Sequence, residues 1–391
     1  MTNVTEILKT LISIPSVNPM GRDVRGDIFG ESRLSDWLMS WFHSIGADCE
    51  RISVSDGHDN VVARFNGNAS KTLLLDVHQD TVPVDGMTID PFGAVIRDGR
   101  MYGRGASDVK GSMAAMLAAF RRLVTERPPS APNVVLSCTC DEESTATGIR
   151  HLVNCWTSAD TPSRLLTSAP DAAIVAEPTE LNAVIAHRGV LRFRVRTRGR
   201  AFHSSDPSQG INAVYRMAPL ITRLQREAEE LQTSGRSDQL CGRATLSVGV
   251  IRGGQSVNIV PDECEIEIDR RLIPGEDPDA VFDDLKQKLT AVDSETECDA
   301  PWISCHALSP ANNAWLADRV LEQTAAVVGP RQAVAVPYCT NASAVSGAGV
   351  PTIVFGPGSI SQAHTVDEFI ELQQVEHAAE ICFRACVNVF Q

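Results

Sequence analysis

The feature that most constrains the fold of this chain is a series of short apolar segments, which precede and follow a long segment with a helical pattern. Continuous apolar runs without polar alternation are typical of strands that are buried on both faces. The predicted strands are "NVVARF" (60–65), "KTLLLDVHQD" (71–80), "APNVVLSCTCDEES" (131–144), "DAAIVAEPT" (171–179) and "VPTIVFGPG" (350–358). Together with a helix predicted over 111–126, they favour an α/β domain whose mainly parallel sheet is flanked by helices.

The middle of the chain has a different pattern. The segment "AHRGVLRFRVRTRGRAFHSS" alternates apolar and polar residues, as a sheet with one wet face would, and "RATLSVGVIRGG" and "ECEIEIDRRLIP" predict two more strands. Helices are predicted over 211–232 and 277–292. Because two helices on an antiparallel sheet form a compact α+β unit, we predict an inserted domain over 187–305. It would separate two parts of the α/β domain, 1–186 and 306–391.

Composition excludes several classes of partner. The 391 residues include 35 Lys and Arg against 49 Asp and Glu, and the net charge of −14 argues against nucleic acids and anionic membranes. The N-terminus predicts an amphipathic helix that ends near Pro15, not a signal peptide, and no run has the length of a membrane span. The 11 cysteines lack paired spacing, so we expect a reduced, cytoplasmic protein.

Histidines and carboxylates follow the ends of the predicted strands or stand in the loops between them. They are His78, Asp80, Asp108, Asp141, Glu142, Glu143, Glu177 and His364. Ligands of open α/β sheets bind at the carboxyl ends of the strands, and like charges gathered there would repel unless a cation stood between them. Two divalent metals about 3.5–4 Å apart would account for this set. Mixed His and carboxylate ligands favour Zn²⁺, with Co²⁺ or Mn²⁺ as alternatives.

Each of these residues also has a structural explanation when it is taken alone. Asp108 could cap the following helix, and the "DEE" run could be a solvated charged face. Glu177 precedes a proline and could belong to a turn, while His78 and His364 could simply form local hydrogen bonds. Only the convergence of the whole set on one edge of the sheet favours the metal site.

Five motifs in order along the chain resemble those of the M20 metallopeptidase family. They are "HQDTVP", "GRGASDVKG", "DEE", "AEPT" and "QAHTVDEF". That family includes acetylornithine deacetylase, succinyl-diaminopimelate desuccinylase, aminoacylase-1 and glutamate carboxypeptidase. The resemblance extends into the inserted segment, where "GRAFHSSDPSQGINAV" and "GGQSVNIVPDECEIEIDRRLIPGE" are similar to the family's lid and dimerisation domain. It implies a Zn-exopeptidase-like catalytic domain and a homodimer formed through the inserted domain.

The resemblance also implies a role for each motif residue. Asp108 would bridge two metals, with His78 and Glu177 completing one site and Glu143 and His364 the other. Two catalytic residues would stand beside these ligands. Asp80 would hydrogen-bond the far nitrogen of His78 and so fix its tautomer, and Glu142 would act as general base and later as general acid.

Substrate-binding residues follow from the same resemblance. His203 would stabilise the oxyanion in the site of the partner chain, and Asn258 would bind substrate. Arg271 would hold the substrate carboxylate through its planar guanidinium. Arg270 is the alternative, although strand alternation directs the two arginines to opposite faces. Gly358, in the "GPGS" loop, would also line the substrate site.

The activity that the resemblance implies is hydrolysis of the amide bond of an N-acyl amino acid. The tail "FGPGSISQAHTVDEFI" is most similar to acetylornithine deacetylases, but the loop "YCTNASAVSGAGVP" lacks the acidic residue expected near Asn341. Aminoacylase, desuccinylase and carboxypeptidase or dipeptidase activities therefore stay open. Two further alternatives are a two-metal enzyme of different chemistry, such as a phosphatase, and a ligand-binding relative without catalysis.

Overall fold

The computed structural model describes residues 3–159 and 162–391, and the chain divides into two compact units. The first unit contains 1–185, 310–334 and 340–391, and the second, here called the inserted unit, contains 186–309 and 335–339. The functional domains predicted over 1–186, 187–305 and 306–391 stay predictions. Within the described residues, no helix combines the length and apolar composition that crossing a bilayer requires.

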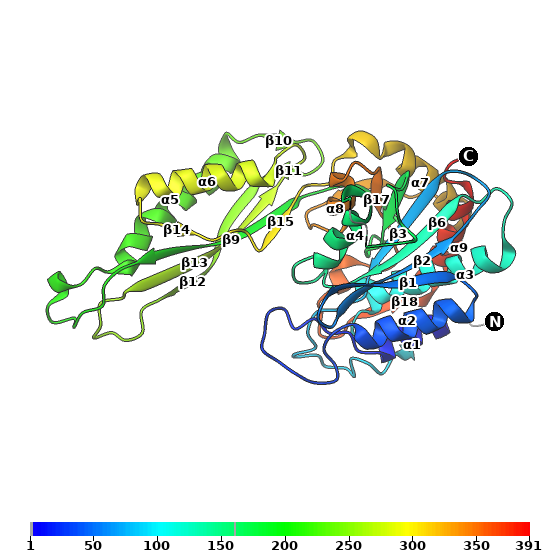
Figure 1. Cartoon of the computed structure of the whole chain (residues 1–391), viewed down its shortest axis with the longest axis horizontal. Coiled ribbons are helices and arrows are strands. Elements are labelled where there is room, and N and C mark those ends of the chain that lie inside the picture. Colours follow the sequence, from blue (N-terminus) through cyan, green and yellow to red (C-terminus); the bar gives the residue numbers. More distant parts are fainter. Residues whose placement is uncertain (1–2, 160–161) are drawn as a thin grey trace. The chain divides into compact units, whose positions relative to one another are not determined.

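An eight-stranded sheet forms the centre of the first unit (Figure 1). Its strands, in spatial order, are β1 (Asp48–Ser55), β2 (His58–Phe65), β6 (Asn133–Thr139), β3 (Thr72–His78), β7 (Ala172–Val175), β17 (Thr352–Val354), β8 (Ala183–His187) and β16 (Ala333–Val336). The neighbours β6, β3, β7 and β17 are parallel, whereas β1, β2 and β8 pair antiparallel. The predicted α/β class, with a mainly parallel sheet, is confirmed.

Helices cover both faces of this sheet because its strands bury alternate side chains on opposite sides. In β3, Leu73 and Leu75 belong to one apolar cluster and Leu74 to another. The helices of the first cluster are α1 (Val4–Ser13), α2 (Ser32–Ser44), α3 (Gly111–Glu126), α7 (Ala314–Val328) and α9 (Leu372–Asn388). The second cluster contains α4 (Thr147–Thr157) and α8 (Ala342–Gly347).

A small three-stranded sheet accompanies the central sheet of the first unit. Its strands are β4 (Val95–Arg97), β5 (Arg100–Tyr102) and β18 (Phe369–Glu371), with β5 in the middle. Phe369 pairs with Tyr102 across β18 and β5. This pairing brings the chain just after His364 beside the chain just before Asp108.

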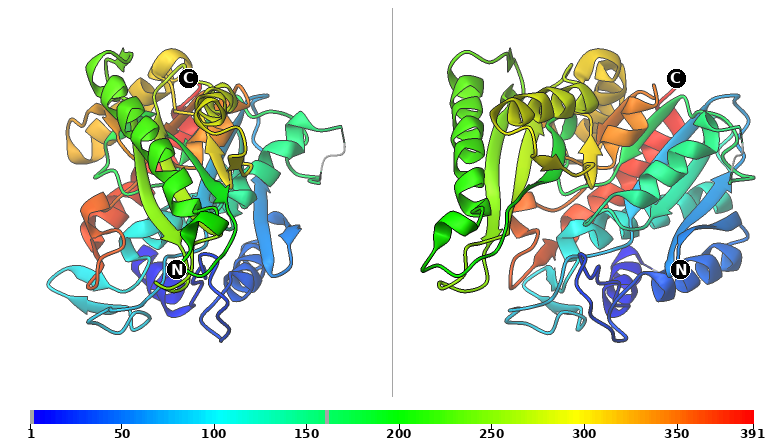
Figure 2. Two further views of the ribbon diagram at one scale, coloured as in Figure 1. Left: turned by 90° about the vertical axis from the view of Figure 1, so that its left-hand side faces the viewer. Right: turned by 60° about the vertical axis from the view of Figure 1, so that its left-hand side comes forward.

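The inserted unit is an antiparallel sheet with two helices on one face (Figure 2). Its strands are β9 (Gly189–Arg198), β12 (Thr245–Gly253), β13 (Glu263–Leu272), β14 (Glu297–Cys298) and β15 (Ile303–Cys305), beside a two-stranded pair, β10 (Ser237–Asp238) and β11 (Gly242–Arg243). The helices are α5 (Ala213–Thr233) and α6 (Pro278–Val292). In β13, Ile266 and Ile268 face the helices while Glu265 and Glu267 face away, so the predicted α+β fold is confirmed.

Candidate metal centre

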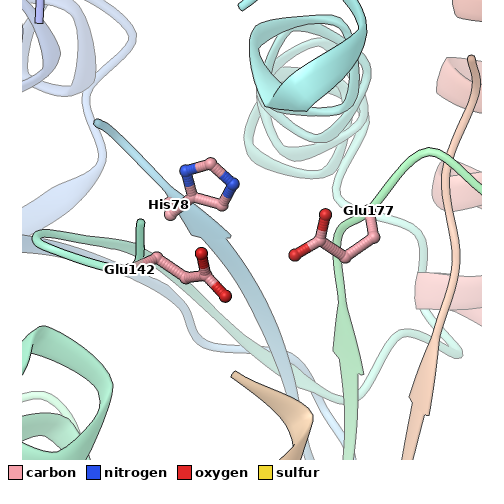
Figure 3. A group of neighbouring side chains, drawn as sticks. All are labelled: His78, Glu142 and Glu177. Atoms are coloured by element: carbon pink, nitrogen blue, oxygen red, sulfur yellow. The ribbon is translucent and has the colours of Figure 1, made fainter. Parts of the chain in front are cut away.

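Three adjacent parallel strands bring the first group of site residues together. His78 is the last residue of β3, Glu142 follows β6 and Glu177 follows β7, and β3 lies between the other two strands. Each of the three offers a ligand atom, and these atoms all lie within 4.8 Å of one another. Figure 3 shows the imidazole and the two carboxylates directed toward a common space at the strand ends.

Asp108 joins this group to a second one. Its Oδ1 lies 3.2 Å from His78 Nε2 and its Oδ2 lies 3.4 Å from His364 Nε2. His364 Nε2 is also 3.3 Å from Glu143 Oε2. Because the two oxygens of one carboxylate face two different histidines, Asp108 has the arrangement of a bridging ligand between two cations.

The electrostatics of the cluster favour cations in this space. Burial, together with the negative charges of neighbouring carboxylates, raises the pKa of Glu142 and Glu177 well above the usual carboxyl range. Burial and the charge of Asp108 raise the pKa of Glu143 to about 7. Glu143 Oε1 is buried and has no hydrogen-bond partner among the residues that the structure describes. The donor set of imidazoles and carboxylates fits Zn²⁺ and similar divalent ions.

The pKa values of the two histidines are also raised, which for a histidine favours the charged form. Hydrogen bonds with Asp108 and Glu143 raise the pKa of His364 to about 10. Burial alone would lower the pKa of His78, but its bonds with Asp108 and Asp80 raise it well above the usual value. Because a metal binds the unprotonated imidazole, metal binding at these rings would release protons.

Asp80 holds the loop that carries the two glutamates. Its carboxylate accepts the backbone N–H groups of Glu142 and Glu143, each at 3.0 Å, and the side-chain amide of Asn18 at 2.9 Å. His78 Nδ1 lies 2.9 Å from the backbone carbonyl oxygen of Asp80 and 3.6 Å from the carboxylate. The carbonyl oxygen and the carboxylate of Asp80 therefore both face this ring nitrogen, with the carbonyl oxygen closer, and the contact with His78 lowers the pKa of Asp80 against the effect of burial. The predicted role of the carboxylate in fixing the tautomer stays a prediction.

The residues predicted in the inserted unit divide between two ends of its sheet. His203 and Asn258 are exposed on neighbouring loops, where Ser204 N donates to Asn258 O at 3.0 Å. Arg271 lies near the end of β13 and donates to Asp269 Oδ1 at 2.7 Å. Arg270 points to the opposite face, is buried and pairs with Glu276 at 2.7 Å, as strand alternation predicts.

Gly358 lies in the first unit and is buried. Its backbone has φ +88°, a Cβ would collide with Ser107 Oγ, and its N–H donates to Gln374 Oε1 at 3.0 Å. Gly358 therefore packs closely against Ser107 of the Asp108 loop and is hydrogen-bonded to α9. Its predicted contact with substrate stays a prediction.

Three further groups near the centre were not predicted. Asn18 Nδ2 bridges the carboxylates of Asp80 and Asp141 at 2.9 and 3.0 Å, and Glu368 holds the loop before Asp108. Asp76, fully buried in β3, accepts the side-chain amide of Asn341 at 3.1 Å. Asn18 lies in the motif "SVNP" and Glu368 in "HTVDEF". The sequence signal for Asp76 was an acidic residue inside an apolar strand.

Comparison with known proteins agrees with this geometry. Residues 74–388 match the family described as Peptidase family M20/M25/M40. An acetylornithine deacetylase of Proteus mirabilis is 32% identical over 96% of this chain and 94% of its own length, and one of Photorhabdus laumondii is 34% identical over 94% and 92%.

Solved structures share the fold. An M20 family metallo-carboxypeptidase from Sulfolobus solfataricus has a TM-score of 0.80 at 22% identity, covering 100% of this chain and 99% of that one. A dinuclear metal-binding M20 peptidase from Bacillus subtilis has a TM-score of 0.69 at 16% identity, with coverage of 98% and 96%. With its histidine and carboxylate cluster at the strand ends, this chain belongs to the M20 family of metal-dependent peptidases and amidohydrolases.

Proposed function

We propose that this protein hydrolyses the amide bond of an N-acyl amino acid in the manner of an acetylornithine deacetylase. The observation that carries the proposal is Asp108, whose two oxygens face His78 and His364 within a cluster of neighbouring carboxylates. Relatives with that name, 32–34% identical over at least 94% of this chain, support the choice of substrate class. Zn²⁺ is the expected metal, with Co²⁺ or Mn²⁺ as substitutes.

Two metal ions would be held by the residues at the strand ends. His78, Asp108 and Glu177 would hold one, and Asp108, Glu143 and His364 the other. When bound, such a pair supplies Lewis acidity for the scissile carbonyl and makes water a nucleophile near neutral pH.

Glu142 is the proposed proton carrier. It would accept a proton from the attacking water and deliver it to the leaving nitrogen, which requires a carboxylate that binds and releases protons near neutral pH. Burial raises its pKa in that direction. Asp80 keeps Glu142 in place because it accepts the N–H groups of both glutamates.

The inserted unit supports a dimeric arrangement of the substrate site. Asn258 lies before the first residue of β13 and Arg271 is its next-to-last residue. Ten extended residues span about 30 Å, too far for both side chains to contact one small substrate. We propose that Arg271 binds the carboxylate in its own chain, while His203 and Asn258 serve the site of a second chain in a homodimer.

The test of activity is a panel of N-acetyl, N-succinyl and N-formyl amino acids and dipeptides, assayed with Zn²⁺ or Co²⁺. We expect N-acetyl amino acids with a free carboxylate, N-acetylornithine among them, to give the highest kcat/KM. The matching carboxamides should be poor substrates, and Arg271→Lys should reduce turnover of the acids, because an ammonium cannot form the paired bonds of a guanidinium. Equal turnover of acid and amide would exclude the carboxylate clamp.

The test of the dimer uses two inactive variants, Glu142→Ala and His203→Ala. In a heterodimer of the two, one site keeps its own Glu142 and receives an intact His203 from the other chain. Co-expression should therefore restore activity to about half of the heterodimer's sites. A heterodimer that forms but stays inactive would show that His203 serves its own chain.

A further inference from the structure

Glu368 makes an unusually complete set of hydrogen bonds with one loop. Its Oε1 accepts the backbone N–H groups of Ser107 at 2.9 Å and Asp108 at 3.0 Å. Its Oε2 accepts the N–H of Gly105 at 2.9 Å and the Arg104 guanidinium at 2.8 Å. The Glu368 side chain is completely buried, so all four donors depend on this one carboxylate.

Backbone hydrogen bonds also connect the segment around Glu368 to the loop before Asp108. The Glu368 carbonyl accepts the N–H of Gly103 at 3.0 Å, and the next residue begins β18, which pairs with β5 just before the loop. Glu368 also follows His364 by four residues. The two loops that carry Asp108 and His364 are therefore fastened to each other by one side chain.

The loop cannot supply these partners itself. Asp108 has φ −119° and ψ 87°, and Val109 has φ −137° and ψ 21°, so both lie outside helical geometry before α3 begins. Buried N–H groups without acceptors are costly. A carboxylate can accept from several N–H groups at once because both of its oxygens are acceptors, whereas an amide side chain would place a donor against them.

We propose that Glu368 is the residue that positions Asp108 as the bridge between the two metal ions. By fixing the Asp108 backbone, it directs Oδ1 toward His78 and Oδ2 toward His364, the geometry observed here. Glu368 does not contact the metals or the substrate, and it acts only through the loop. The inference rests on the proposed two-metal centre.

The decisive variant is Glu368→Gln, studied in the full chain after removal of bound metal. We expect calorimetric titration with Zn²⁺ to show affinity reduced by about 10–100-fold, the range typical when a group that orients a metal ligand is lost. In the Co²⁺-loaded variant, magnetic coupling between the two ions through Asp108 should weaken, as seen by electron paramagnetic resonance.

Glu50→Gln is the matched control. The Glu50 carboxylate also accepts two backbone N–H groups, those of Arg164 and Leu165 at 3.1 Å each, and lies 3.7 Å from the Arg164 guanidinium. It stands on β1, which β2 and β6 separate from β3. Glu50→Gln should therefore lower stability while leaving Zn²⁺ affinity and the Co²⁺ spectrum unchanged.

The possible results distinguish the role of Glu368 from the two-metal centre on which that role rests. Wild-type affinity in Glu368→Gln, or equal losses in both variants, overturns the role of Glu368. A wild-type chain that fails to bind two ions overturns the two-metal centre instead. If Glu368→Gln does not fold, Arg104→Met/Glu368→Gln takes its place in the titration, since removing both charges leaves no buried guanidinium without a partner.

Discussion

Two regions of this molecule gather charged residues in different ways. On the outer face of the inserted unit's sheet, arginines of β9 stand opposite acids of β13. The pairs are Arg192 with Asp269 at 2.7 Å, Arg194 with Glu267 at 3.0 Å and Arg196 with Glu265 at 2.7 Å. These side chains are partly exposed, and each charge meets its opposite, so this ladder has the features of a structural element.

At the strand ends of the first unit the balance is different. Glu142, Glu143 and Glu177 lie among other carboxylates, and all three have raised pKa values because of burial. His364 lies 3.3 Å from Glu143, and the charge of His78 acts on Glu142 and Glu177. The contrast teaches that a charged cluster indicates ligand binding when its like charges are buried together, and indicates structure when each one is paired.

The largest expected effect comes from separating two adjacent acids of the cluster. Glu142→Gln should lower kcat by about 10²–10⁴-fold, the contribution of a positioned proton carrier, while both metals stay bound. Glu143→Gln should lose metal, because its carboxylate is a proposed ligand. Metal content by atomic absorption and steady-state kinetics check this pair, and equal metal loss in both variants would contradict the assignment.

Metal removal should destabilise only one of the two regions. At a free metal concentration of 100 times Kd, binding adds about 2.7 kcal/mol per independent site to the stability of the folded chain. Chelation should therefore speed hydrogen exchange in the loops around His78, Asp108 and Glu177 and leave β9 and β13 unchanged. Peptide-level mass spectrometry measures both regions at once, and a uniform change across the chain would count against a local metal centre.

Metal affinity should rise with pH. The pKa of His364 is raised to about 10 and that of Glu143 to about 7 in the metal-free chain, so both groups are largely protonated at pH 6. A ligand must lose its proton to bind metal, and each proton released contributes up to about tenfold in affinity per pH unit. Titrations from pH 6 to 8 should show this increase; an affinity independent of pH would show that these groups are not ligands.

The smallest effect is expected from the ladder. Arg194→Gln should lower the free energy of unfolding by about 0.2–1 kcal/mol, the range for exposed ion pairs, and the loss should shrink at high salt. Arg194 is 35% exposed and pairs with Glu265 and Glu267 at 3.1 and 3.0 Å. Metal affinity should not change. Urea titration and Zn²⁺ calorimetry on the same preparation test both statements.

Much of the fold followed from local patterns. The helix predicted over 111–126 is α3 with the same ends, because an apolar face and a preceding glycine-rich loop define it. The strand predicted over 171–179 is shorter in the structure, where β7 ends at Val175. Pro178 lies three residues further on and has no N–H to donate to a neighbouring strand, so the pairing could not continue through it. The alternating segment from 186 begins with the last two residues of β8 (Ala183–His187), which belongs to the first sheet and was not predicted, and continues as β9 (Gly189–Arg198) in the second sheet. Periodicity alone cannot show that the chain passes from one sheet to the other.

The candidate site was predictable in its residue types and less so in its connections. His78, Glu142 and Glu177 were expected to converge because they follow parallel strands, and they do. The partner of Asn341 was not predictable, since Asp76 is distant in sequence and reaches it only across the folded sheet. The role of Glu368 was not predictable either. It accepts backbone N–H groups, and a sequence pattern does not indicate which backbone groups a side chain will bond.

The strand order of the central sheet has a consequence for how this protein is made. β17 lies between β7 and β8, although β7 and β8 are close in sequence and β17 comes near the C-terminus. During synthesis, β7 and β8 must therefore wait for the last part of the chain before the sheet can close. The inserted unit, built mainly from the continuous stretch 186–309, can fold on the ribosome before the first unit is complete.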